Sequence, residues 1–356
     1  MTPRPHRLGR SAVRVGTLAF GAAGIGNLFT PVTDDEAARA VDSAWEAGVR
    51  YFDTAPHYGL GLSERRLGAA LRARPRHEFA VSTKVGRILE PAPSAVGDDL
   101  AHGFAVPATH RRRWDFSARG VRRSIEESLE RLGLDRIDIA YLHDPDDHLE
   151  QALDQAYPEL ERMRDEGVVG AIGAGMNHAG PLARLVRETD VDAVLLAGRY
   201  TLLDQSGLVE LLPLAAERGV GVVVGGVFNS GLLADPRPGA TFDYAPAHFD
   251  ALSRALELQT VCERHGVPLR AAALHFPFGS PAVTSVLTGA RSAAEVRDAA
   301  SLLGRPVPDA LWSDLKERGL LPADVPTPRL PPRDPDRPLD GPRTPDVVAP
   351  IHPEQP

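Results

Sequence analysis

The strongest constraint on the fold is a regular alternation of short apolar runs with amphipathic stretches. The runs are nearly continuous in hydrophobic residues, as expected of parallel strands that are covered on both faces. Eight pairs of strand and helix over roughly 280 residues predict a closed (β/α)8 TIM barrel. An open sheet of six or seven strands is the alternative. The eight runs are VGTLAF, VRYFDTA, FAVSTKVG, IDIAYLH, VVGAIGAG, AVLLAG, GVVVGGVF and VTSVLTG.

A glycine-rich stretch near the amino terminus, GTLAFGAAGIGN, suggests a Rossmann domain instead. Its glycines at positions 21, 24 and 26 resemble the turn that cradles a dinucleotide pyrophosphate. Such a turn should open a helix directly, with an acidic residue about 20 positions later. Here the segment NLFTPV separates the glycines from the first helix, which Thr33 and Glu36 begin with a capping box. The sequence therefore favours the barrel.

Two segments interrupt the alternation. Residues 90–116 make a long connection after the third strand, and its aromatic residues favour an ordered lid over a flexible insert. From residue 322 to 356 the chain contains 12 prolines, which oppose helix and sheet and predict a disordered tail. We therefore expect one barrel domain over residues 1–321, followed by the tail.

Composition limits the kinds of partner. The net charge of −8 gives no reason to expect nucleic acid or a membrane surface. No apolar run approaches the roughly 18 residues of a membrane helix, and no secretory signal is visible. A single cysteine, Cys262, fits a reducing compartment. We expect a cytoplasmic protein that acts on a small molecule without a metal. Its oligomeric state is left open.

Four polar residues follow consecutive predicted strands. Asp53 and Tyr58 lie in YFDTAPHYG after the second strand, Lys84 ends the third in VSTKVG, and His143 ends the fourth in YLHDPDDH. The carboxyl ends of barrel strands meet at one mouth, so these side chains should converge. Lys84 is one of only two lysines among 40 basic residues, which indicates a need for a compact charge. A buried ammonium requires a partner, and Asp53 is the natural one.

Together the four residues predict proton transfer by a tyrosine. Taken singly, Asp53 could be a strand-end cap, Tyr58 an exposed loop residue and His143 a structural histidine. A free phenol has a pKa of about 10, and a nearby ammonium should lower it. With Lys84 held by Asp53, Tyr58 could protonate an alkoxide or deprotonate an alcohol. His143 could then donate a hydrogen bond to the reacting oxygen.

These motifs, in this order, resemble the aldo-keto reductase superfamily from about Arg7 to Pro328. The segments RRRWDFSARGVRRSIEESLERLGLDRIDIAYLHDPDDH and AGRYTLLDQ are similar to its branch of D-threo-aldose 1-dehydrogenases, L-fucose dehydrogenases and pyridoxal 4-dehydrogenases. The resemblance implies hydride transfer between C4 of a nicotinamide cofactor and a carbonyl or hydroxyl carbon. It also implies a cofactor that lies extended across the barrel mouth, without a Rossmann domain.

The resemblance further implies a cofactor site at the strand ends, with some departures from the family pattern. Ala197 replaces the usual glutamine of strand six, and Gly225 replaces an aromatic residue of strand seven. Arg291 and Ser292 could hold the 2′-phosphate of NADP, but the carboxylate of Glu295 would repel it, which favours NAD. The residues expected at the cofactor are Gly16, Thr17, Leu18, Asp53, Asn177, Arg199, Tyr200, Phe228, Asn229, Ser230, Gly231, Leu232, Gly289, Ala290, Arg291 and Glu295.

Beside the reacting centre we expect Phe29, His57, Trp114, Asp144 and Asp146 to line a substrate site. Asp144 stands where many reductases of the superfamily have an aromatic residue, and carboxylates accept hydrogen bonds from sugar hydroxyls. Both aspartates could instead cap the turn that follows. We therefore predict oxidation of an L-fucose-like or D-threo aldose at C1 to a lactone, with Tyr58 as the base.

Four alternatives stay open at this stage. Two keep the same chemistry with another substrate: a pyridoxal 4-dehydrogenase, or a general aldehyde and ketone reductase. A third is a regulatory barrel that binds the cofactor with little turnover. The fourth is a Schiff-base aldolase with Lys84 as its nucleophile.

Overall fold

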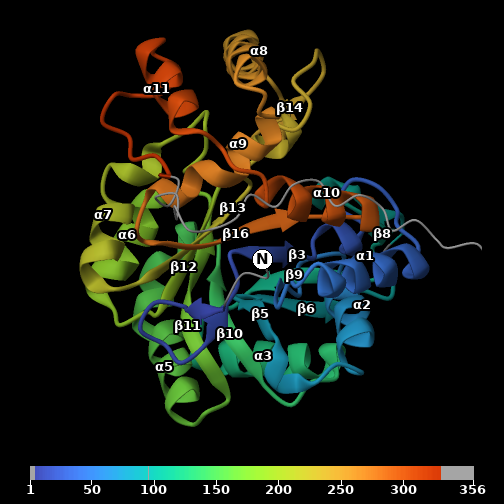
Figure 1. Cartoon of the computed structure of the whole chain (residues 1–356). Helices are drawn as coiled ribbons and strands as arrows, with labels where there is room; N and C mark the ends of the chain where they lie inside the picture. The colour runs from blue at the N-terminus through green and yellow to red at the C-terminus, as the bar shows by residue number, and fades with distance from the viewer. Residues whose placement is uncertain (1–4, 95, 330–356) are drawn as a thin grey trace, which may run out of the picture.

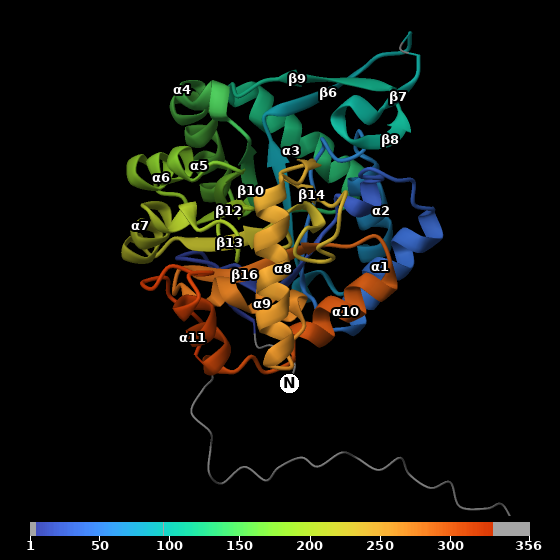
Figure 2. The same cartoon turned by 90° about the horizontal axis from the view of Figure 1, so that it is seen from above.

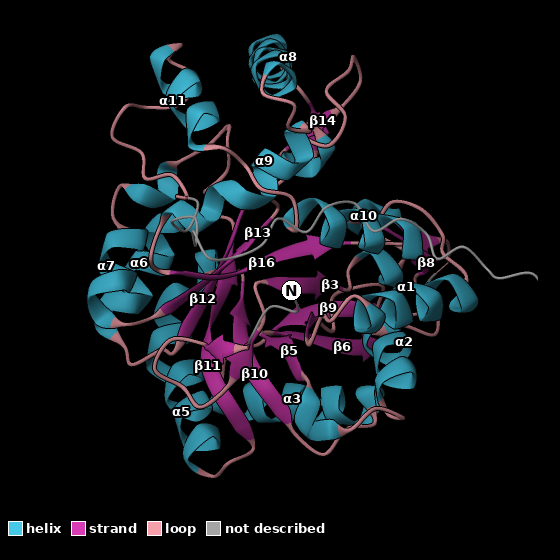
Figure 3. Ribbon diagram, in the orientation of Figure 1, coloured by secondary structure: helices cyan, strands magenta, loops and turns pink. Residues whose placement is uncertain are grey.

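The computed structural model describes residues 5–94 and 96–329 and shows a closed barrel of eight parallel strands (Figures 1 and 3). The predicted (β/α)8 barrel is therefore confirmed. Each strand pairs with the next one along the chain, and the last barrel strand, β16, pairs with the first, β3. In chain order the barrel strands are β3 (Leu18–Gly21), β4 (Tyr51–Asp53), β5 (Ala80–Val85), β10 (Ile137–His143), β11 (Val169–Met176), β12 (Ala193–Ala197), β13 (Gly221–Gly225) and β16 (Val283–Gly289).

Helices surround the ring of strands, as Figure 1 shows. The predicted capping box of α1 is present, because Thr33 and Glu36 each accept a hydrogen bond from the other's backbone. Helix α2 begins at Leu62, and the hydroxyl of the next residue, Ser63, donates to the Ala22 carbonyl. The helices are α1 (Asp34–Glu46), α2 (Leu62–Leu71), α3 (Ala118–Leu132), α4 (Leu149–Gln151), α5 (Tyr157–Asp165), α6 (Ala179–Glu188), α7 (Leu211–Arg218), α8 (Phe249–Arg264), α9 (Leu269–His275), α10 (Ala293–Leu303) and α11 (Asp309–Glu317).

Successive strand residues point alternately into the barrel and out toward the helices. Phe52 packs in the layer between strands and helices, whereas its neighbour Tyr51 belongs to a separate cluster inside the barrel. A short antiparallel pair, β1 (His6–Arg7) with β2 (Arg14–Val15), adds two fully buried side chains, Leu8 and Val15, to that interior cluster. The strands of this pair precede β3, so the carboxyl ends of the barrel strands form the opposite mouth.

The segment after β5 folds as two antiparallel pairs. β6 (Arg87–Pro91) pairs with β9 (His110–Trp114), and between them β7 (Asp98–Asp99) pairs with β8 (Phe104–Pro107). Phe104 also forms a bridge with Leu28, which ties this segment to the loop after β3. Figure 2 shows β6 and β9 extending beyond the ring of helices. The segment is thus held at its base by main-chain hydrogen bonds on two sides.

The packed chain continues past residue 321. Val325 is buried, and Pro326 lies directly against Gly279. The remainder of the predicted tail, residues 330–356, lies outside the described residues. Among the helices that the structure describes, none has both the length and the apolar composition needed to cross a membrane.

Candidate active site

Asp53, Tyr58, Lys84 and His143 come together at the carboxyl ends of β4, β5 and β10. The Lys84 ammonium donates to Asp53 Oδ2 at 2.7 Å, to the Thr54 carbonyl at 3.1 Å and to the Tyr58 hydroxyl at 3.0 Å. The ring of His143 stands edge-on to that of Tyr58, with centroids 5.9 Å apart. The convergence of these four side chains expected from the sequence is therefore present in the structure.

The alternation of side chains along the strands explains this convergence. Asp53 lies in register with Ser82, and Tyr141 with Lys84. Since residues two apart share a face, Ser82 and Lys84 both point into the barrel, as do Tyr51 and Asp53. The Ser82 hydroxyl donates to the other oxygen of Asp53 at 2.7 Å. Both oxygens of this buried carboxylate are thus fixed by neighbouring side chains.

Glycines position the loop that carries Tyr58. A Cβ atom added to Gly59 would lie 2.2 Å from the Gly26 carbonyl oxygen, and one added to Gly26 would lie 3.1 Å from the Tyr58 backbone. Gly59 also has a positive φ of 61°. These glycines therefore allow two loops to touch, and they do not form a phosphate-binding turn at the start of a helix. The structure thus agrees with the sequence argument against a Rossmann domain.

Burial sets the charge states of the site. For Lys84, burial opposes the ammonium, but Asp53 and Tyr58 outweigh that effect, so its pKa lies above the usual value. For Tyr58, burial raises the pKa to about 12, and the opposing effect of Lys84 is smaller. The net lowering predicted from the sequence is therefore wrong, because that argument counted the ammonium and neglected the loss of solvent. At neutral pH the site holds a protonated phenol beside a charged lysine.

His143 and His57 are both neutral at neutral pH. Burial, reinforced by the charge of Arg87, lowers the pKa of His143 well below its usual range and that of His57 to about 2. Their rings lie edge to face with centroids 5.6 Å apart. The Nδ1 atom of each is buried and has no hydrogen-bond partner within the described part of the chain. Both imidazoles can therefore offer a nitrogen to a bound molecule.

Sequence reasoning missed Arg87, which follows Lys84 by three residues and begins β6. Its guanidinium pairs with the Asp144 carboxylate and lies 4.4 Å from the centre of the Trp114 ring. Asp144 in turn lies 3.6 Å from Nε2 of His143. The Asp144 carboxylate therefore pairs with Arg87. The turn that follows, Asp146–His148, has Pro145 at its N-cap position and no side-chain capping bond. The one indication of Arg87 in the sequence was that it follows Lys84 by only three residues.

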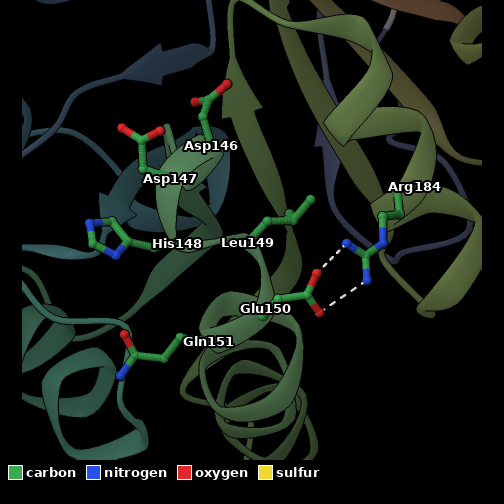
Figure 4. Close-up of a pocket in the computed structure, with 7 residues that line it drawn as sticks. All are labelled: Asp146, Asp147, His148, Leu149, Glu150, Gln151 and Arg184. Atoms are coloured by element: carbon green, nitrogen blue, oxygen red, sulfur yellow. Dashed lines mark hydrogen bonds and ion pairs between the residues drawn. The ribbon is translucent and has the colours of Figure 1, made fainter.

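The other expected substrate residues are spread more widely. His57 packs against Phe104, and Phe29 is half-exposed beside the ring of Tyr244. The Asp146 carboxylate accepts a hydrogen bond from His178 Nδ1 at 2.5 Å. It lines an outer hollow of about 440 Å³ beside α4 and Arg184 that contains none of the four converging residues (Figure 4). Its charge also acts on the neighbouring Asp144 carboxyl, whose pKa it helps to raise beside the larger effect of burial.

The expected cofactor residues of β11 to β13 surround a short hairpin, β14 (Thr241–Phe242) with β15 (Ala245–Pro246). Arg199 forms an ion pair with Asp243 at 2.9 Å, and the Ser230 hydroxyl accepts from the Tyr244 backbone at 3.0 Å. Asn177, directly after β11, hydrogen-bonds the Tyr244 side chain. The hairpin thus connects three strand ends across this side of the mouth.

Three of the expected cofactor placements are wrong. Leu18 begins β3 and Gly16 and Thr17 precede it, so all three lie at the amino end of the strand, whereas Gly21 is the residue in register with Asp53. The reason is that the strand starts later than the apolar run VGTLAF suggests. The side chains of Tyr200 and Leu232 are fully buried and belong to the main hydrophobic core.

The loop after β16 carries a compensated charge. Gly289 ends the strand, and Arg291 pairs with Glu295 through its side chain at 3.3 Å and its backbone N–H at 2.7 Å. Ser292 caps α10 by accepting a hydrogen bond from the Glu295 backbone. The positive charge nearest to this strand end is therefore already opposed by a carboxylate.

These residues fit a dinucleotide. Asn229 bonds the Gly198 carbonyl through its nitrogen, but its buried side-chain oxygen has no partner among the described residues. A Cβ atom added to Gly231 or to Gly289 would meet nothing within 4 Å, so the chain leaves space beside both. Polar groups at successive strand ends, with open space beside glycine, suit a ligand that is long and polar. Phe228, between β13 and Asn229, packs partly against the core.

A closed (β/α)8 barrel with a lysine-bound tyrosine and a histidine at its mouth defines a class of oxidoreductases that pair hydride transfer with proton transfer. The Aldo/keto reductase family model matches residues 17–318. The chain is 48% identical over 317 residues to a D-threo-aldose 1-dehydrogenase of a Pseudomonas species, covering 88% of this chain and 96% of the relative. It is 39% identical to a pyridoxal 4-dehydrogenase of Microbacterium luteolum, covering 88% and 97%.

Solved structures agree with these similarities. A holo-form aldo-keto reductase from Bacillus halodurans superposes with a TM-score of 0.71 at 26% identity, covering 91% of this chain and 98% of that one. The chain belongs to the aldo/keto reductase family. It is an oxidoreductase that uses a nicotinamide cofactor and acts on a small molecule.

Proposed function

We propose that the protein is an NAD-using dehydrogenase that oxidises the C1 hydroxyl of an aldose to a lactone. The observation that carries this proposal is the buried chain from Asp53 through Lys84 to the Tyr58 hydroxyl, beside the polar pair of Arg87 and Asp144. The chain from Asp53 to Tyr58 suits proton transfer, and the pair of Arg87 and Asp144 suits a substrate with hydroxyl groups. The similarity to a D-threo-aldose 1-dehydrogenase at 48% identity supports the same substrate class.

In the proposed reaction a nicotinamide cofactor held by Asn177, Arg199 and Ser230 would supply the hydride acceptor for C1 of the sugar. Tyr58 Oη takes the proton of the C1 hydroxyl, and C1 becomes the carbonyl carbon of the lactone. Lys84 stabilises the phenolate that this requires, since its ammonium donates to Oη at 3.0 Å. Asp53 keeps that ammonium in position and balances its charge. In the reverse direction Tyr58 returns the proton to the reacting oxygen.

His143 orients the reacting oxygen in this proposal. Its imidazole is neutral, because burial and Arg87 hold its pKa low, so one ring nitrogen carries a proton and the other does not. A neutral imidazole can donate a hydrogen bond without adding a positive charge beside Lys84. Phe104 packs against the rings of both Tyr58 and His57 and shields the site from water on the side of the 87–116 segment.

NAD is favoured over NADP by the loop after β16. A 2′-phosphate bound by Arg291 would also meet Glu295, whose carboxylate accepts from the Arg291 backbone at 2.7 Å. Repulsion between two anions on an exposed surface opposes NADP binding, whereas a ribose hydroxyl can donate to the same carboxylate. Asn177, Arg199 and Ser230 would bind the cofactor, and the open space beside Gly231 would accommodate it.

The test is a spectrophotometric assay of purified protein with NAD or NADP, a panel of aldoses, pyridoxal and simple aldehydes. The expected result is reduction of NAD with L-fucose-like or D-threo sugars. Activity toward simple aldehydes alone would contradict the sugar proposal, and a hundredfold preference for NADP would contradict the proposed cofactor.

A further inference from the structure

We propose that Arg87 and Asp144 form a hydroxyl-reading pair, which selects polyhydroxylated substrates over simple aldehydes. This inference rests on the proposed function, because it names how the same site recognises a sugar. Sequence motifs did not indicate Arg87. Its part in the proton-transfer proposal is limited to helping keep His143 neutral, where burial has the larger effect. Its place in the structure gives the reason for its presence.

Arg87 lies at the edge of the site with 14% of its side chain exposed, and its hydrogen-bonding groups are only partly paired. One terminal nitrogen of the guanidinium contacts the Asp144 carboxylate, and its face lies over Trp114. The Nε atom is buried and has no hydrogen-bond partner in residues 5–94 and 96–329. Leaving a buried N–H of a charged group unpaired is costly, so a ligand that accepts a hydrogen bond there would be stabilised.

Asp144 is fixed beside the reacting centre. It directly follows His143, has a left-handed φ of 42°, and its backbone N–H donates to the Gly175 carbonyl at 3.0 Å. One carboxylate oxygen lies 3.6 Å from His143 Nε2. Because a positive φ is strained for aspartate, the structure holds this carboxylate in a conformation that the isolated chain would rarely adopt.

The charges of this pair favour a neutral ligand. The guanidinium donates and the carboxylate accepts, and a hydroxyl group can do both. Two adjacent hydroxyls of a sugar ring can therefore bond both partners at once, whereas a simple aldehyde has no group beyond its carbonyl. An anionic substrate would gain from Arg87 but would be repelled by Asp144. The ring of Trp114 lies under the guanidinium and stacks on Phe116, so it helps to hold Arg87 in place.

The experiment compares the unaltered protein with Arg87→Met, Asp144→Asn and the double variant. Each is assayed with an aldose, with the matching deoxy-aldose and, in the reducing direction, with a simple aldehyde. Arg111→Met is the matched control, because Arg111 lies on the same hairpin and pairs with Glu90 but its side chain is 75% exposed. Arg87→Lys restores the charge without the planar fork.

We expect Arg87→Met to lower kcat/KM for the aldose by about 10–100-fold, mostly through KM, as loss of a hydrogen bond to a charged group does. The simple aldehyde should change by less than about threefold, and the preference for the aldose over its deoxy analogue should disappear. The double variant should be little worse than either single one, because the two residues act on the same hydroxyls. Arg87→Lys should recover part of the loss, and Arg111→Met should match the unaltered protein.

Equal losses for aldose and aldehyde would show a merely structural role and overturn the inference, as would an unchanged preference for the aldose. Calorimetric titration of the aldose separates this inference from the proposed function. An unaltered protein that binds the aldose, without oxidising it, while Arg87→Met does not bind it, would support the pair and refute the dehydrogenase proposal. Absence of aldose binding to the unaltered protein would refute the pair.

Discussion

The replacement Tyr58→Phe tests the proton-transfer proposal most directly. It removes only Oη, which accepts a hydrogen bond from the Lys84 ammonium at 3.0 Å, while the ammonium keeps Asp53 and the Thr54 carbonyl as partners. The remaining ring can still pack against Phe104. We therefore expect the free energy of unfolding to fall by at most about 3 kcal/mol, the usual limit for one hydrogen bond to a charged group.

Catalysis should suffer much more. A positioned general acid or base contributes about 10²–10⁴ in rate, which corresponds to roughly 3–5 kcal/mol of transition-state stabilisation. The assay measures kcat by the absorbance of the reduced nicotinamide, with unfolding in urea followed in parallel. Tyr157→Phe is a matched control in the helical layer, since its hydroxyl is hydrogen-bonded too: it donates to Glu161 and accepts from the Asp190 backbone N–H. A Tyr58→Phe variant that retains more than about a tenth of the activity would refute the reasoning.

Further predictions concern pH, cofactor choice and the 87–116 segment. Burial raises the pKa of Tyr58 to about 12. Oxidation needs the phenolate, so its kcat should rise with pH over the alkaline range, whereas reduction needs the phenol and should not accelerate. A kcat for oxidation that is flat from neutral to alkaline pH would contradict this. Replacing Glu295 by arginine should raise kcat/KM for NADP relative to NAD by about tenfold or more, because an anion that repels the 2′-phosphate becomes a cation; an unchanged ratio in the two-cofactor assay would show that Glu295 does not contact the ribose. Asp99→Asn should lower the free energy of unfolding, measured in urea, by about 3–5 kcal/mol. It breaks a buried ion pair with Arg112, which donates to the two Asp99 oxygens at 2.7 and 2.5 Å. A loss below about 1 kcal/mol would mean that solvent replaces the pair.

The barrel was predictable because its signal is repeated eight times. Errors in the limits of a single strand, such as the late start of β3 at Leu18, do not change the number or order of strands. The convergence of Asp53, Lys84 and His143 was predictable for a related reason. Each ends a strand, and parallel strands bring their carboxyl ends to one mouth whatever the lengths of the loops.

The sequence did not show the features that depend on how deeply a side chain is buried or on the course that a loop takes. Burial raises the pKa of Tyr58, and one of the residues packed against its ring is Phe104, which is 46 residues away in the chain and reaches the phenol only after the segment between β6 and β9 has folded back. Arg87 was missed because its partner, Asp144, reaches it from another strand.

The two-residue periodicity of β5 separates two kinds of sequence change. Deleting one residue between Ser82 and Lys84 would turn the ammonium outward into the helical layer and abolish its contact with Asp53, although composition would be almost unchanged. Lengthening the connection between β6 and β9 would leave that contact intact and alter only what surrounds it. New specificities can therefore arise by insertion in the loops, while the reaction itself tolerates no shift along the strand.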